Sequence, residues 1–150
     1  MFIPVCLGNA VHLHWRLFIN AVQGGAGIPA NASEIEMRSF LGGTDQCNGG
    51  IATSSGASFG TAAGAFDDGA DQWTSSDPTP CWIAYQFATP VSVRQVALTC
   101  AAHLFSPPAA NPTNFDLQYS DNGTDWVTLQ NFTTTWAGTD PETQLFNVTA

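Results

Sequence analysis

The chain has 150 residues, of which 44% are hydrophobic and only 10% are charged, and its formal net charge at pH 7 is −9. This length and hydrophobic content predict one folded domain with a substantial core, and they argue against disorder. A negative chain with no Lys and three Arg residues repels phosphate groups, so nucleic acid and anionic membranes are not expected partners.

Residues 1–12 are interpreted as an N-terminal apolar arm. Its first seven residues are too few to span a membrane, are interrupted by Pro4, and lack the basic residues that begin a secretion signal. We therefore expect no membrane insertion. The arm is expected to pack on its own domain or on a second copy of the chain, which would make a homo-oligomer.

Alternation of apolar and polar residues with a period of two predicts about eight short β-strands and no helix. The predicted strands cover residues 13–19, 33–38, 51–54, 81–87, 93–100, 114–120, 126–129 and 144–148. Loops rich in Gly, Ser, Pro and Asp separate them, including an acidic loop over residues 65–73. Short strands with such turns predict an all-β fold, an antiparallel jelly-roll β-sandwich.

The clearest element is a β-hairpin over residues 114–129. Phe115, Leu117 and Tyr119 alternate with polar residues, which places three large apolar side chains on one face. Asn122 and Gly123 tolerate positive φ, so they allow the chain to reverse between the strands. The apolar face requires a second sheet to cover it.

The four cysteines, Cys6, Cys47, Cys81 and Cys100, do not have the spacing of a metal site. Four cysteines allow three pairings into two disulfides. We expect a Cys81–Cys100 bond, because these two residues open and close neighbouring strand segments. The alternative is that all four are buried free thiols, which behave as small hydrophobic residues.

No group of side chains in the sequence is typical of a catalytic centre. There is no G-x-S-x-G motif around a serine nucleophile. Asp67 and Asp68 are adjacent, so their carboxylates diverge, whereas a glycosidase needs two carboxylates that face one sugar. We therefore expect that the chain is not an enzyme.

Residues 115–126, with the sequence FDLQYSDNGTDW, resemble the hairpin motif F-x-I-x-Y-S-x-D-G-x-x-W of discoidin domains, which are also called coagulation-factor type C domains. Four shorter segments resemble other motifs of that family in the same order: AFD at 65–67, WTS at 73–75, WIAYQF at 82–87 and VRQVAL at 93–98. Carbohydrate-binding modules of family 32 share this galactose-binding-like fold. The resemblance implies a discoidin-like domain over residues 13–150.

Two further segments, WRLFI at 15–19 and EIEM at 34–37, resemble the closing part of the family pattern but lie near the N-terminus. The resemblance therefore implies a circularly permuted strand order, which keeps the core contacts of a sandwich whose termini lie close together. This arrangement resembles domains of bacteriophage virion proteins. It implies a location on a virion surface, in a tail or capsid, or another extracellular location.

By this resemblance the chain is a binding module that recognises host-surface glycans with loops at one end of the sandwich. Sugar recognition needs an aromatic face for the C–H side of the ring and polar groups for its hydroxyls. The candidate ligand-binding residues are Trp73, His103, Phe105, Asn111 and Asn114, with residues 23–31 as a wall. Trp82 is a further candidate, but its place in a predicted inward-facing strand favours the core.

The alternative function is a structural subunit that decorates or assembles the virion. Its loops and apolar arm would then contact other virion proteins rather than sugar. A low charge content and an apolar N-terminal segment fit packing into such an assembly.

The resemblance also implies a structural Ca²⁺. The family's ligands in the A-F-D and E-I-E motifs correspond to Asp67 and Glu34, and hard cations prefer carboxylate and carbonyl oxygens. The alternative is that Asp67 caps its turn by accepting backbone N–H bonds while Glu34 is solvated.

Overall fold

Strands form almost all of the regular structure in the computed structural model, which describes residues 10–101 and 108–150. The strands are β1 (His12–Val22), β2 (Pro29–Ala32), β3 (Glu34–Arg38), β4 (Ile51–Ser54), β5 (Ala57–Gly60), β6 (Trp73–Pro78), β7 (Cys81–Val91), β8 (Gln95–Cys100), β9 (Pro112–Ser120), β10 (Val127–Thr133) and β11 (Glu142–Asn147). A 3-10 turn, η1 (Ala63–Ala65), leads into the acidic loop. No helix within the described ranges is long and apolar enough to cross a membrane.

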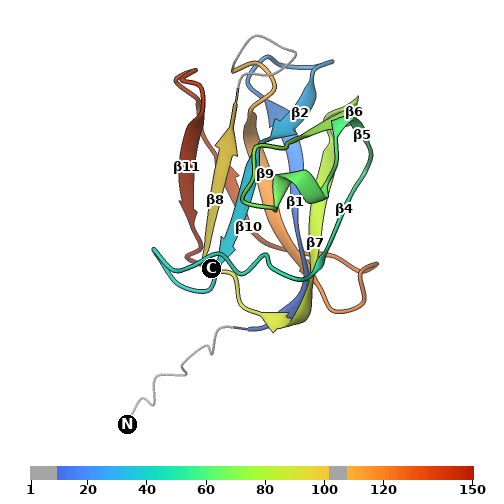
Figure 1. The fold of residues 1–150 in the computed structure, drawn as a ribbon, viewed down its shortest axis with the longest axis vertical. Coiled ribbons are helices and arrows are strands. Elements are labelled where there is room, and N and C mark those ends of the chain that lie inside the picture. The colour runs from blue at the N-terminus through green and yellow to red at the C-terminus, as the bar shows by residue number, and fades with distance from the viewer. Residues whose placement is uncertain (1–9, 102–107) are drawn as a thin grey trace.

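Two antiparallel sheets form the sandwich that the sequence predicts. The larger sheet has the order β10-β9-β1-β7-β4, and the smaller one has the order β11-β8-β3. The strands run along the long axis of the molecule, and the connecting loops gather at its two ends (Figure 1). The first strand, β1, lies between β7 and β9 in the middle of the larger sheet. A circular permutation relative to the usual domain stays a prediction.

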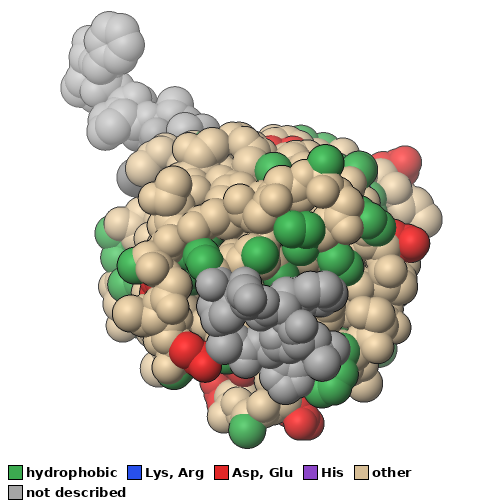
Figure 2. Space-filling view, turned by 90° about the horizontal axis from the view of Figure 1, so that it is seen from above, with side chains coloured by type: hydrophobic (Ala, Val, Ile, Leu, Met, Phe, Trp, Pro, Cys, Tyr) green, Lys and Arg blue, Asp and Glu red, His purple; other side chains and the backbone are tan. Residues whose placement is uncertain are grey.

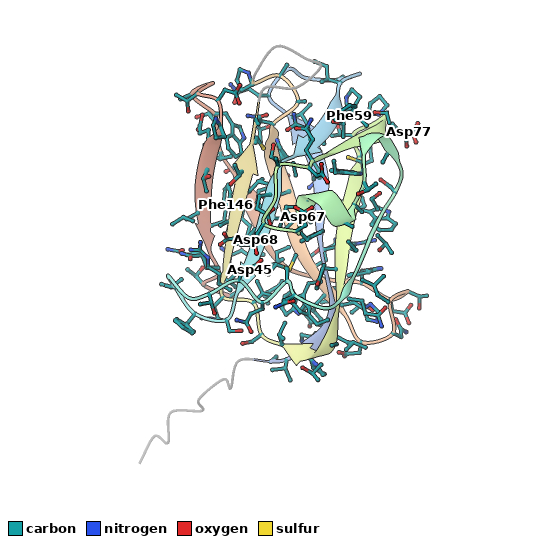
Figure 3. All side chains as sticks on the ribbon, viewed as in Figure 1. Asp45, Phe59, Asp67, Asp68, Asp77 and Phe146 are labelled. Atoms are coloured by element: carbon teal, nitrogen blue, oxygen red, sulfur yellow. The ribbon has the colours of Figure 1, made fainter. Side chains whose placement is uncertain are left out.

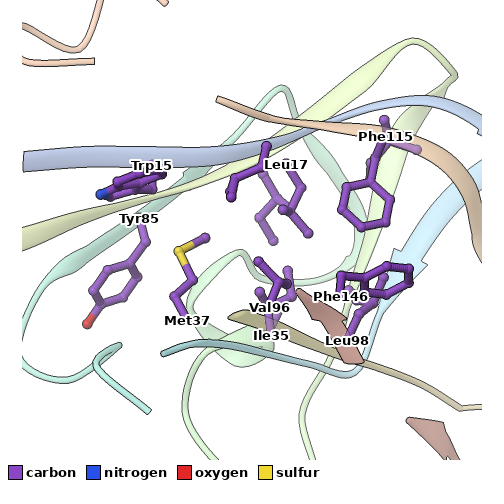
Figure 4. Close-up of a cluster of buried hydrophobic side chains, with 14 of the residues drawn as sticks. Trp15, Leu17, Ile35, Met37, Tyr85, Val96, Leu98, Phe115 and Phe146 are labelled. Atoms are coloured by element: carbon purple, nitrogen blue, oxygen red, sulfur yellow. The ribbon is translucent and has the colours of Figure 1, made fainter. Parts of the chain in front are cut away.

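The core fills the space between these two sheets. Leu17 on β1 is opposite Ile83 on β7 and Leu117 on β9, and all three side chains are fully buried. Figure 4 shows Trp15, Leu17 and Phe115 on one side of the core, facing Ile35, Val96, Leu98 and Phe146 of the smaller sheet. Burial of this apolar surface is the main favourable term that holds the sheets together.

The described residues form eleven strands rather than about eight, because three short strands form a third sheet. This sheet has the order β2-β6-β5, and it lies in segments that the sequence analysis assigned to loops. The sequences of β2 and β5 are PANA and ASFG, which carry no alternation of large apolar residues. A period-of-two pattern therefore could not identify them.

The hairpin prediction is correct in its strands and differs in its turn. Phe115 and Leu117 are fully buried, whereas Tyr119 is half-buried and stacks on the His12 ring with a centroid distance of 3.7 Å. Of the two turn residues, only Gly123 adopts a positive φ, of 77°. The Asn122 side chain instead accepts the backbone N–H groups of residues 124 and 125, at 2.9 and 2.8 Å.

The predicted Cys81–Cys100 disulfide is wrong, because both residues are buried free thiols, as is Cys47. Cys81 begins β7 in the larger sheet, whereas Cys100 ends β8 in the smaller one and donates to the Asn31 carbonyl at 3.7 Å. Burial raises the pKa of each of the three thiols. Thiols of this kind are small core residues with little reactivity. Cys6 and most of the predicted arm lie outside the described residues.

Candidate functional site

Three carboxylates meet where β3 begins, next to the acidic loop. They belong to Glu34 at the start of β3, Asp45 in the loop after β3, and Asp68 after η1, and one oxygen of each lies within 4.8 Å of the others. Figure 3 shows Asp45 and Asp68 on the two loops that meet here. We call these three residues the carboxylate cluster.

Local backbone structure holds each member of the carboxylate cluster in place. One Asp45 oxygen accepts the backbone N–H groups of Met37 and Cys47, both at 3.0 Å. Asp68 adopts a φ of 57°, a left-handed conformation that Asp tolerates better than most residues. Its backbone N–H donates to Glu34 at 3.1 Å, which joins the acidic loop to β3.

Burial and mutual repulsion disfavour negative charge in the carboxylate cluster. Desolvation, followed by the charges of Asp68 and Asp45, raises the pKa of Glu34 to about 8. Desolvation also raises the pKa of Asp45. Oε1 of Glu34 and Oδ2 of Asp45 are buried and have no hydrogen-bond partner among the described residues. Hard divalent cations prefer carboxylate oxygens as ligands, so a cation could bind the two oxygens that have no hydrogen-bond partner.

Only part of the predicted Ca²⁺ ligand pair lies in this cluster. Glu34 is a member, but the Asp67 side chain is exposed and caps its turn by accepting the Gly69 N–H at 2.7 Å. Asp45 and Asp68 were not predicted as members. No sequence pattern identifies Asp45, because its loop meets the acidic loop only through the tertiary fold.

Two of the loop residues predicted to bind sugar, Trp73 and Asn111, are buried in the described part of the chain. Trp73 is 0% exposed, and its indole N–H donates to the Gly56 carbonyl at 3.0 Å, so its assignment as a sugar platform is wrong. Asn111 is also buried, and its backbone bonds to residues 23 and 108. The predicted residues His103 and Phe105 lie outside the described part of the chain.

Asn114 lies near the start of β9, on the outer face of the larger sheet. Its side-chain oxygen accepts hydrogen bonds from Asn20 at 2.9 Å and from Asn131 at 3.0 Å, so it is already part of a polar network. Figure 2 views the end of the sandwich where the predicted loop site would lie. Hydrophobic side chains are scattered over this face, and acidic groups lie in its lower part and at its right edge.

A second group of residues lies on the solvent side of the larger sheet, and the sequence analysis did not predict it as a site. By alternation, β1 presents His14, Arg16 and Phe18 on this side, and β7 presents Trp82. Trp126 reaches the same surface from the turn between β9 and β10. We call these five residues the Arg16 face. Trp82 is half-buried here, so its assignment to the core is wrong.

Arg16 is the centre of this face. Its guanidinium carbon lies 4.2 Å from the centroid of the Trp126 ring, 5.2 Å from that of Phe18 and 5.6 Å from that of Trp82. These are distances at which a cation is attracted to an aromatic ring. Its Nε donates to the Gln118 side chain at 2.7 Å. Desolvation by its neighbours lowers the pKa of Arg16.

A hollow of about 240 Å³ lies on the same side of the sheet, one strand away from Arg16, which does not itself line it. Residue Ala84, opposite Arg16 on the neighbouring strand, forms its floor, because a methyl group leaves room between Trp82 and Gln86 on the same side of β7. The other lining residues are His14, Thr53, Tyr85, Gly123 and Trp126. The surface thus combines two indole rings with neutral polar groups around one shallow depression.

Sequence comparison identifies the family to which this sandwich belongs. The model of the F5/8 type C domain matches residues 50–150, from the end of the loop before β4 to the C-terminus. Neither a curated protein nor a solved structure matches the chain. Domains with this family description are generally non-catalytic modules that bind carbohydrates or proteins. Because the match covers more than half of the chain and the fold is an antiparallel β-sandwich, the chain belongs to the F5/8 type C domain family.

Proposed function

We propose that the chain is a non-catalytic carbohydrate-binding module and that it binds glycans with the Arg16 face. The family binds carbohydrates or proteins, so the choice of sugar depends on the chemistry of this surface. The observation that carries the proposal is the hollow beside Arg16, which has Trp82 and Trp126 in its walls.

Aromatic rings on a sheet face suit the flat, C–H-rich side of a sugar. Indole rings supply a large apolar surface at a small cost in side-chain entropy. Both tryptophans are half-buried, so each ring is held by its neighbours and still offers surface to a ligand. The hollow is smaller than the roughly 300–1,000 Å³ of pockets that enclose drug-sized ligands. Its size therefore suits one sugar ring that lies against the sheet.

The polar side chains around the hollow suit sugar hydroxyls. His14, Thr53 and Gln86 offer donors and acceptors on three of its sides. The described residues that line the hollow include no Asp or Glu, and glycoside hydrolysis by the common mechanism needs two such residues. This composition favours binding without cleavage.

We place the module on a virion surface, where it would recognise glycans of the host cell. Support comes from the order of the sequence motifs, which resembles the permuted domains of bacteriophage virion proteins.

Removing either tryptophan ring is expected to abolish most of the sugar binding. Trp82→Ala and Trp126→Ala should each weaken retention on a glycan array or column by roughly tenfold or more, because about 1.4 kcal/mol of lost contact energy is a factor of ten. Phe40→Ala is the matched control, since Phe40 is 63% exposed but lies outside the Arg16 face. Melting curves should show that all three variants fold. Full retention by both tryptophan variants would remove the Arg16 face from the site.

We also propose that a Ca²⁺ bound by the carboxylate cluster stabilises the fold. The two buried carboxylate oxygens without partners, in Glu34 and Asp45, support a cation here. Asp68 would supply the third carboxylate. We assign this Ca²⁺ a role in stability rather than in sugar binding, because no residue of the carboxylate cluster belongs to the Arg16 face.

A second possible function is docking onto another virion protein or onto another copy of the chain, and exposed apolar residues favour it. Phe40 and Leu41 are 63% and 58% exposed, and with Arg94 and Val148 they line a hollow of about 310 Å³. Exposed apolar side chains next to one another are typical of interaction surfaces.

The docking function predicts self-association that depends on this surface. Sedimentation should show oligomers at high concentration, and the double substitution Phe40→Ser and Leu41→Ser should return the chain to monomers while sugar retention is unchanged. Deletion of residues 1–7 tests the contribution of the predicted arm in the same way. A monomer at every concentration, without capture of any virion protein, would refute this second function.

A further inference from the structure

We infer that the Arg16 face selects sugars that carry a carboxylate, such as uronic or sialic acids, and that the Arg16 guanidinium binds this group. The inference rests on the proposed function and names the class of sugar that the site takes. Three features of Arg16 carry it: a fixed position, the absence of a counter-charge, and its place next to the hollow.

The position of Arg16 is fixed before any ligand binds. The rings of Phe18, Trp82 and Trp126 surround its guanidinium at 4.2 to 5.6 Å. Its Nε bonds to Gln118, whose amide in turn donates to Thr128 at 2.9 Å. A side chain held in this way loses little further conformational entropy when a ligand arrives, which favours affinity.

Arg16 also lacks a partner for its charge. Among the described residues it forms no ion pair, and none accepts a hydrogen bond from its two Nη atoms. Arg38 differs, because it forms an ion pair with Glu36. A partly desolvated cation without a counter-charge is costly, and a ligand anion would offset that cost. The lowered pKa of Arg16 has the same physical cause.

The free edge of a guanidinium matches a carboxylate in shape. Its N–H donors form a planar fork that can bind both carboxylate oxygens at once, through bonds stronger than those between neutral groups. A sugar hydroxyl accepts at one oxygen only, so a neutral sugar uses this fork less well. The fork therefore provides a means of discrimination.

The strand register places Arg16 directly beside the hollow. Gln118, Arg16, Ala84 and Thr53 form one row across β9, β1, β7 and β4, and Ala84 is the floor of the hollow. Neighbouring strands are about 4.8 Å apart, so Arg16 is one strand away from a sugar that rests over Ala84. A carboxylate that projects from the ring toward β1 would reach the guanidinium.

The test compares acidic sugars with neutral sugars of the same skeleton. Suitable pairs are sialyllactose with lactose, and oligogalacturonate with the same oligomer after its carboxyl groups are reduced to alcohols. Measurements should be made near 0.15 M salt, where the Debye length of about 8 Å limits repulsion from the net charge of −9. The wild-type chain should bind the acidic member of a pair roughly tenfold to a hundredfold more tightly.

Arg16→Gln should remove this preference, so that the ratio of the two affinities within a pair falls to about one. Arg16→Lys should keep part of the preference, because it retains the charge but not the planar fork. Melting curves check that both variants fold. If Arg16→Gln does not fold, the wild-type chain can be tested with methyl-esterified oligogalacturonate, which keeps the skeleton but has no charge and should bind like the reduced oligomer.

The outcomes separate this inference from the proposed function. No binding of any sugar would refute both. Equal binding of acidic and neutral members, with loss of both in Trp82→Ala, would refute the inference and keep the proposed function. A preference that persists in folded Arg16→Gln would show that another group binds the carboxylate, which overturns the role of Arg16.

Discussion

Replacement of Phe115 with Ala is expected to lower the free energy of unfolding by about 3–5 kcal/mol, the range for a buried aromatic side chain. Phe115 is 0% exposed, and its ring lies 4.9 Å from that of Phe146 and 5.4 Å from that of Phe132. Since Phe146 belongs to the smaller sheet, the substitution opens a cavity between the two sheets. The total free energy of unfolding of a protein domain is about 5–15 kcal/mol, so this substitution would remove a large share of the stability.

Denaturant titration should therefore show a lower midpoint with an unchanged slope. Leu145→Ala is the matched control, because Leu145 is next to Phe146 in sequence but is 56% exposed, and its cost should stay within about 0.5 kcal/mol. The loss of unfolding free energy in Tyr119→Ala should lie between those of Phe115→Ala and Leu145→Ala, since Tyr119 is only half-buried. A cost below about 1 kcal/mol for Phe115→Ala would contradict the packing of the two sheets.

The strands of the two main sheets could be predicted from sequence because each has one buried face. On β1 and β9, large apolar residues alternate with polar ones, and the structure buries the apolar set. The strands β2, β5 and β6 have no such pattern, since their order comes from pairing with one another. Trp73 illustrates the difference: its neighbours in sequence indicate a loop, but the fold buries it and brings its indole N–H to the distant Gly56 carbonyl.

The Arg16 face could have been predicted only in part. Alternation with Ile83 places Trp82 on the solvent side of β7, but the general preference of aromatic residues for the core favoured the opposite assignment. Alternation with Trp15 and Leu17 similarly places Arg16 outside. The meeting of Arg16, Trp82 and Trp126 depends on which strands pair, and pairing between distant segments leaves no local sequence signal.

The carboxylate cluster could also be predicted only in part, because its residues come from segments that are distant in sequence. Glu34 could be predicted because it belongs to a motif that resembles the family pattern. Asp45 belongs to a loop with no recognisable motif, and it comes near Glu34 only because of the antiparallel bridge between Arg38 and Asp45. The acidic loop contributes Asp68 rather than Asp67 to the cluster, and the Asp67 carboxylate caps the turn instead.

Addition of Ca²⁺ to chelator-treated protein is expected to raise the melting temperature, with a larger effect near pH 8 than near pH 5. In the folded chain the pKa of Glu34 is about 8, above its ordinary value of 4.5. The stability linked to this group is therefore fully present below about pH 4.5 and is lost as the pH rises through about 8. A bound cation removes this loss, because it neutralises the charges that repel one another in the cluster.

The size of the effect follows from binding to the folded state alone. At a free Ca²⁺ concentration 100 times Kd, the added stability is about 2.7 kcal/mol. For a domain of this size, about 1 kcal/mol moves the melting temperature by roughly 2–4 °C, so a shift of roughly 5–10 °C is expected near pH 8. Differential scanning calorimetry with EDTA and with Ca²⁺, at both pH values, measures it.

Glu34→Gln separates coordination from charge repulsion in this cluster. In EDTA near pH 8 this variant should melt at or above the temperature of the wild-type chain, because a neutral amide of similar shape no longer repels Asp45 and Asp68. Its response to Ca²⁺ should be lost, because a carboxylate ligand is missing. Asp67→Ala is the matched control from the same loop: it should cost about 1 kcal/mol through loss of the turn cap and keep the Ca²⁺ response. A wild-type melting temperature that is the same in EDTA and in Ca²⁺ near pH 8 would rule out a cation in the carboxylate cluster.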